Sequence, residues 1–139
     1  MTRLSLVLLL LLSGCRAVSP TGTQYETPMR DYAKSRVLYY GNLAGIGSPG
    51  VWFGLPPQVP DGQTPEASWI GCPGPAVVNW NAYWLENMAT LAQVDHGAAH
   101  EVAHLFYGFN SGNCVDTSAL EAQAEACAFA LQAGSACHG

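Results

Sequence analysis

The side chains best suited to catalysis lie in the pentapeptide His100-Glu101-Val102-Ala103-His104. On a helix, residues four positions apart differ by about 40° in rotation and ~6 Å in rise, so both histidine rings point the same way. Two imidazoles placed in this way can bind one zinc ion. Glu101 is rotated about 100° from His100 and can reach a zinc-activated water without binding the metal. The motif therefore predicts a zinc site in which Glu101 is the general base.

The alternative interpretation is a helix whose histidines are ordinary core or surface groups. The chain contains four histidines in 139 residues, which makes a chance occurrence of the pattern rare, at about 0.5% per sequence. A third candidate ligand elsewhere in the chain would favour the zinc interpretation further.

Two glutamates downstream of the motif are candidates for this third ligand. A catalytic zinc usually has three protein ligands and one open position. Glu121 lies 17 residues after His104, and Glu125 lies one helical turn further on the same face. We expect Glu121 to bind the metal and Glu125 to accept a hydrogen bond from a ligating histidine, although the reverse assignment also fits the spacing. Glu121 also completes the capping box Ser118-x-x-Glu121, which would turn its side chain toward the helix start.

Other polar and aromatic residues near the motif are weaker candidates for a role in catalysis or binding. His96 lies one turn before the motif, and we expect it to be solvent-exposed rather than to contact substrate or a ligand. Tyr83 and Tyr107 are able to stabilise a developing oxyanion, but packing is the commoner role for tyrosine. Trp80 and Trp84 are expected in the wall of the site or in the core.

Two helices must position these residues. The first is expected at 94–109, with an apolar side formed by Ala99, Val102, Ala103 and Phe106. The second is expected at 118–133, because this segment is rich in alanine and is followed by Gly134.

The segments before these helices favour a sheet. Three runs rich in β-branched and aromatic residues are expected to be strands: 35–40, 50–55 and 76–81. The intervening segment 56–75 contains six prolines and three glycines, which predicts a long surface loop. A further short helix fits 83–91. The predicted fold is α+β, with a small mixed or antiparallel sheet packed on the active-site helix and on a second, ligand-bearing helix.

The two-helix pattern resembles the gluzincin family of zinc metallopeptidases over about thirty residues, 99–131. The resemblance implies a zincin-like catalytic domain in which Zn²⁺ is bound by His100, His104 and Glu121, with Glu101 as the base. The strand at 76–81 resembles the family's edge strand, which binds peptide substrates antiparallel. The chain is much smaller than thermolysin and has no long C-terminal subdomain, so His138 is the one candidate beyond the second helix for stabilising the transition state.

The beginning of the chain has the layout of a bacterial lipoprotein signal. Arg3 precedes an apolar run that is far shorter than the ~20 residues of a membrane-spanning helix. Leu12-Ser13-Gly14-Cys15 resembles a lipobox, which implies cleavage before Cys15 and lipid attachment to its sulfur. The expected organisation is a signal peptide at 1–14, a lipidated tether at 15–27 and a catalytic domain at 28–139. A core helix, a membrane span or an unmodified thiol are the alternatives.

Four cysteines remain in the predicted exported domain: Cys72, Cys114, Cys127 and Cys137. An even number in an exported protein indicates two disulfides, for which three pairings are possible. A turn at Gly134 would bring Cys137 back to Cys127. A second metal site is the alternative, but the chain has no Cys-x-x-Cys pair.

Composition narrows the possible partners. The net charge is −5 and charged residues make up 11% of the chain, which argues against a nucleic-acid partner. The histidine motif and the resemblance to the gluzincins imply a zinc metallopeptidase, a hydrolase that cleaves peptides or proteins. The resemblance to a lipobox implies that it is anchored by lipid to the bacterial cell envelope. The alternatives are a non-catalytic envelope lipoprotein domain with structural or no zinc, and a zinc amidase acting on cell-wall material. An open position beside three ligands favours an enzyme over a structural site.

Overall fold

The structure, a computed structural model, describes residues 27–54, 67–70, 76–111 and 118–138. Its elements follow one another as α2 (Pro28–Leu43), β1 (Gly50–Gly54), β2 (Ala67–Ile70), β3 (Val77–Asn81), α3 (Ala82–Asn87), α4 (Leu91–Ser111) and α5 (Ser118–Gln132). The side chains of 67–70, 109–111 and 118 lie outside the description. These elements form a small α+β domain, as the sequence predicts, in which helices predominate.

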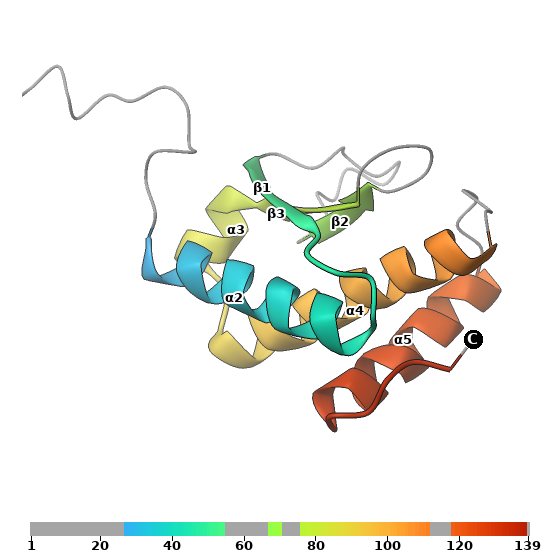
Figure 1. Cartoon of the computed structure of the whole chain (residues 1–139). Helices are drawn as coiled ribbons and strands as arrows, with labels where there is room; N and C mark the ends of the chain where they lie inside the picture. Colours follow the sequence, from blue (N-terminus) through green and yellow to red (C-terminus); the bar gives the residue numbers. More distant parts are fainter. Residues whose placement is uncertain (1–26, 55–66, 71–75, 112–117, 139) are drawn as a thin grey trace, which may run out of the picture.

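Helix α4, which carries the histidine motif, is the central element of the fold (Figure 1). It packs against α2 and α5, and it also contacts the sheet through β2 and β3. Buried side chains from several elements form one continuous core, the largest of them being Trp80, Tyr40, Leu85, Leu105 and Leu131. Because α4 has neighbours on several sides, these neighbours can bring side chains to the motif.

The described strands form a mixed sheet in the order β1-β3-β2. Strand β3 pairs with β1 in parallel, with Val77 opposite Gly50, and with β2 antiparallel, with Trp80 opposite Ala67. The strands predicted at 50–55 and 76–81 therefore exist, as β1 and β3.

Two other predictions about this region are wrong. The segment 76–81 does not form an edge strand, because β3 is paired on both sides. The segment 56–75 is not a loop throughout, because it contains β2. The prolines that suggested a loop flank this strand, and the stretch between Pro65 and Pro73 contains none. Prolines at strand ends are compatible with pairing, whereas prolines inside a central strand are not.

The segment 35–40, predicted to be a strand, lies inside α2, so this prediction is also wrong. The hydroxyl of Thr27 caps the helix by accepting a hydrogen bond from the backbone N–H of Arg30 at 3.3 Å, and Pro28 occupies the first turn. The fully buried side chains recur at helical spacing: Ala33, Val37 and Tyr40. Packing of this face against α4 outweighs the strand preference of the β-branched and aromatic residues.

Helix α4 begins before the predicted range of 94–109 because Thr90 and Gln93 form a capping box. The Thr90 hydroxyl accepts from the Gln93 backbone N–H at 3.2 Å, and the Gln93 side chain accepts from the Thr90 backbone N–H at 2.9 Å. Further along, Gly97 lets the helix approach the sheet closely. A Cβ added there would lie 3.3 Å from the Trp80 ring, which is tighter than ordinary packing.

The end of α5 is fixed by a turn and a disulfide. Gly134 has a positive φ of 82° and lets the chain reverse after the helix. The reversed segment brings Cys137 to Cys127, and the two form a disulfide with their Cα atoms 5.0 Å apart. This is the pairing that the turn at Gly134 suggested. Cys72 and Cys114 lie outside the described residues.

Candidate metal centre

His100, His104 and Glu121 converge between α4 and α5. The Nε2 atoms of the two histidines lie 3.1 Å apart. One oxygen of the Glu121 carboxylate lies 2.8 Å from Nε2 of His100, and the other lies 2.9 Å from Nε2 of His104. Tetrahedral ligands at 2.0–2.2 Å from zinc are about 3.3 Å apart, so the donor set has nearly the required size. Two imidazoles and a carboxylate are also ligands that suit zinc, and these residues therefore fit the metal.

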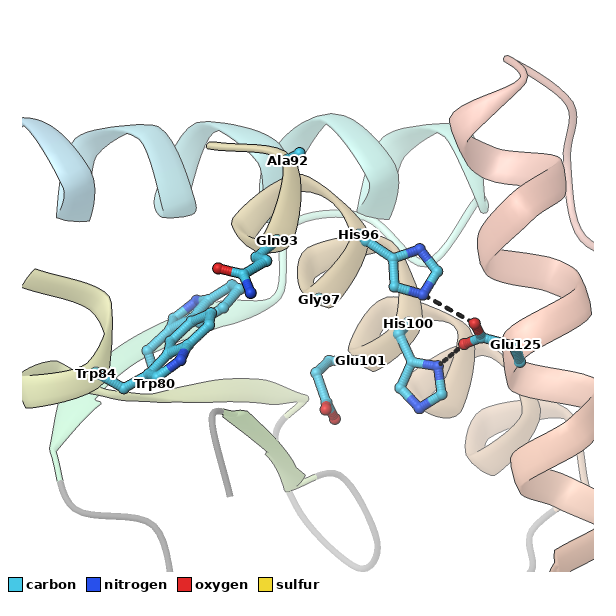
Figure 2. A pocket seen from close by; sticks show the side chains of 9 residues that line it. All are labelled: Trp80, Trp84, Ala92, Gln93, His96, Gly97, His100, Glu101 and Glu125. Carbon is cyan, nitrogen blue, oxygen red and sulfur yellow. Dashed lines mark hydrogen bonds and ion pairs between the residues drawn. The ribbon is translucent and has the colours of Figure 1, made fainter. Parts of the chain in front are cut away.

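The carboxylate of Glu125 lies on the other side of the His100 ring. One of its oxygens is 2.7 Å from Nδ1 of His100, and the other contacts His96 (Figure 2). Partial burial would raise the pKa of Glu125, but the hydrogen bond with His100 and the charge of His96 outweigh burial and lower the pKa below its usual value. An ionised Glu125 accepts the Nδ1–H of His100 and leaves Nε2 free to bind a metal.

A second group of side chains on the same helices also has metal-binding chemistry. His96, His100 and Glu125 present ligand atoms within 4.8 Å of one another. Their rings converge less, since the ring centroids of His96 and His100 are 6.3 Å apart, against 4.8 Å for His100 and His104. The set of His100, His104 and Glu121 is therefore the more compact metal site.

Glu101 lies next to this set on α4. It is buried, with 9% of its surface exposed, and it lines a cavity beside the histidines. In Figure 2 the Glu101 side chain and the His100 ring extend to the same side of α4. This placement suits a proton acceptor at the metal site.

The cavity beside Glu101 has a volume of about 520 Å³. One end is formed by His96 and His100 and the other by two tryptophans, Trp80 and Trp84 (Figure 2). The two indole rings stack with their centroids 6.3 Å apart and their planes 2° apart. Both tryptophans are also buried in the core. A space of this size with apolar walls and a few polar groups is typical of a small-molecule or side-chain binding site.

His96 makes more contacts than the sequence suggested. Its Nε2 lies 2.9 Å from Glu125, and its Nδ1 lies 2.7 Å from the side-chain oxygen of Gln132. The expectation of a merely exposed histidine is therefore wrong. Its partners lie 29 and 36 residues further along the chain, so no local pattern pointed to them.

The other residues considered from sequence lie outside this cluster. Tyr83 is 65% exposed, so it is not a packed aromatic. The Tyr107 hydroxyl donates a hydrogen bond to the backbone carbonyl of His138 at 3.1 Å, which ties the segment after α5 to α4. Cys15 and the side chain of Ser118 lie outside the described residues.

Asp95 of α4 links this helix to α2 and α5, and it bonds the same glutamine, Gln132, that contacts His96. It accepts hydrogen bonds from Arg36, from the Tyr40 hydroxyl at 2.9 Å and from the Gln132 amide at 2.9 Å. Partial burial would raise the pKa of Asp95, but these hydrogen bonds and the charge of Arg36 together lower it below the usual value. The ionised form is thus favoured by the fold.

This lowered pKa predicts a loss of stability in acid. Because Asp95 binds a proton more weakly when folded, its contribution is present above the unfolded pKa of 3.8 and is lost as pH falls through the lower, folded value. Between about pH 6 and about pH 3, the free energy of unfolding of the metal-free protein should fall more in wild type than in Asp95→Asn. Denaturant titrations at the two pH values measure this difference. Asp31→Asn, which changes an exposed carboxylate on α2, is the control, and an equal acid loss in wild type and Asp95→Asn contradicts the prediction.

No family model, curated protein or solved structure matches this chain. The chemistry of the candidate metal centre is therefore inferred from its own residues. Among the described side chains, two histidines of one helix and a glutamate of its neighbour converge, beside a buried glutamate and a cavity with apolar walls.

Proposed function

We propose that this protein is a zinc-dependent metallopeptidase with a zincin-like domain that resembles the gluzincins. The observation that carries the proposal is the convergence of His100, His104 and Glu121, with their donor atoms 2.8–3.1 Å apart. The buried side chain of Glu101 lines the same cavity as His100. A structural zinc normally has four protein ligands, whereas three leave a position for water or substrate.

Each residue has a distinct role in this proposal. His100 and His104 would bind the metal through Nε2, and Glu121 would complete the set from α5. Zinc held there would act as a Lewis acid, which lowers the pKa of water to about 7. Glu101 accepts a proton from the attacking water and can deliver it to the leaving amine. Glu125 holds His100 in the tautomer that exposes Nε2.

The cavity supports a peptide substrate. It lies directly beside Glu101 and His100, and its volume of about 520 Å³ accommodates a large side chain. Trp84 and Gly97 contribute apolar surface to its wall. A substrate side chain held there would place the adjoining peptide bond near Glu101.

Two measurements test the proposal. The domain without residues 1–15 should bind one zinc per chain and cleave a denatured protein, and removing the metal with a chelator should stop cleavage. Zinc binding without cleavage would favour a structural site. Activity on isolated cell wall alone would make the protein a zinc amidase. A protein that binds no zinc would contradict both the metallopeptidase and the amidase assignments.

We also propose that the protein is exported and anchored by lipid at Cys15. In the part of the chain that the structure describes, no helix is long and apolar enough to cross a membrane. Because the proposed lipid is attached to the Cys15 sulfur, Cys15→Ser should move the protein from the membrane fraction to the soluble fraction or leave the leader uncleaved. Fractionation and metabolic labelling with a fatty acid measure this, with Ser13→Ala as the control that keeps Cys15. Unchanged processing and partition in Cys15→Ser would contradict lipidation.

A further inference from the structure

A continuous chain of hydrogen bonds runs from α2 through α4 and α5 to the candidate metal centre. Its first part joins Arg36 and Tyr40 to Asp95, and Asp95 to Gln132. Its second part joins Gln132 to His96. From there it runs from His96 to Glu125 and from Glu125 to His100 (Figure 2). The distances from Gln132 onward are all between 2.7 and 2.9 Å. The site is thus connected to three helices by polar groups.

The carboxylate of Asp95 can only accept hydrogen bonds, and this determines which group donates in each bond that follows. The carboxylate of Asp95 accepts, so the Gln132 group that faces it at 2.9 Å must be the NH₂ donor. The amide oxygen of Gln132 then faces His96, and because an amide oxygen only accepts, Nδ1 of His96 must donate. Asp95 therefore fixes the orientation of Gln132 and, through it, a proton on His96.

The same reasoning extends to the metal ligand. Nε2 of His96 faces one oxygen of Glu125 at 2.9 Å, and Nδ1 of His100 faces the other at 2.7 Å. Both carboxylate oxygens accept, so both histidines donate to Glu125; His96, which also donates from Nδ1 to Gln132, does so as an imidazolium. With the proton of His100 held on Nδ1, its Nε2 presents a lone pair toward His104 and Glu121.

We propose that His96 and Gln132 are positioning residues, which orient Glu125 and thereby hold His100 in the tautomer that binds the metal. The inference rests on the proposed zinc site and assigns roles to two residues outside it. A purely structural role is a weaker explanation, because the side chains of His96 and Glu125 are 35% and 42% exposed. Partly exposed pairs of this kind add little to the stability of a fold. Other contacts already hold these helices together: α4 packs directly against α5, and Asp95 of α4 pairs with Arg36 of α2.

The test is the zinc affinity of variants of the full-length purified protein, measured by competition with a chelator. His96→Ala should weaken binding roughly 10- to 100-fold, the usual scale for a partner of a metal ligand. His96→Gln should restore much of the affinity, because its amide can still donate to Glu125. Gln132→Met should weaken binding, whereas Gln123→Met changes an exposed residue of the same helix and should not.

The free energy of unfolding of each metal-free variant distinguishes positioning from folding. Affinity losses with unchanged metal-free stability support the inference. Equal zinc affinity in wild type, His96→Ala and Gln132→Met overturns it, as do losses that only follow reduced stability or a His96→Gln variant as weak as His96→Ala. Wild-type protein that binds no zinc overturns the proposed function itself, so the two failures are distinct.

Discussion

Replacing Glu101 by glutamine is expected to reduce peptide hydrolysis at least ~10²-fold while zinc stays bound. Glutamine has nearly the same size and can occupy the same buried place beside His100, but its amide cannot take a proton from water. Loss of a general base typically costs 10²–10⁴-fold in rate. Steady-state cleavage of a fluorogenic peptide and metal content of the same preparation measure the two halves of the prediction.

A matched control separates the role of the base from a general effect of charge. Glu86→Gln removes one carboxylate from α3, where Glu86 pairs with Arg30 at 2.6 Å and does not line the cavity. This variant should retain wild-type turnover. If Glu101→Gln also cleaves at the wild-type rate with zinc bound, Glu101 has no part in the mechanism.

The helices of the site were predictable from sequence because their signals are local. The spacing of His100 and His104, the alanine-rich segment and Gly134 all lie within one or two helical turns of the feature that they indicate. The capping box of Thr90 and Gln93 was equally local and would have given the true start of α4. The burial of Val37 on α2 was harder to predict, because it depends on α4 lying alongside.

Sheet order and the network around the metal centre depend on contacts between distant parts of the chain. Strand β3 pairs with β1 and β2, and no residue of 76–81 specifies which neighbour lies on which side. His96 has the same local surroundings as an exposed helical residue until α5 brings Glu125 and Gln132 against it. Residue spacing thus predicts which side chains share a helix face, and the packing of a second helix determines their partners.

Zinc binding is expected to suffer most when the third ligand is replaced, so Glu121→Gln should lose zinc during dialysis. Glu125→Gln should still bind zinc, roughly 10- to 100-fold more weakly than wild type. The oxygens of Glu121 face Nε2 of both His100 and His104, at 2.8 and 2.9 Å. Glu125 instead faces Nδ1 of His100 and reaches His96, at 2.7 and 2.9 Å. Glu121 is therefore placed as a ligand, and Glu125 as the acceptor that orients one.

The two substitutions control for each other, because each removes one negative charge from α5 and replaces a carboxylate by an amide of the same size. Glu121 is 53% exposed, so its loss should leave the metal-free fold intact, and unfolding of the metal-free variants checks this point. Zinc content after dialysis and competition with a chelator give the ranking. The reverse ranking would place the metal at His96, His100 and Glu125, the second group with suitable donors. Glu121 would then be the capping residue of α5, and the proposed arrangement of ligands would be wrong.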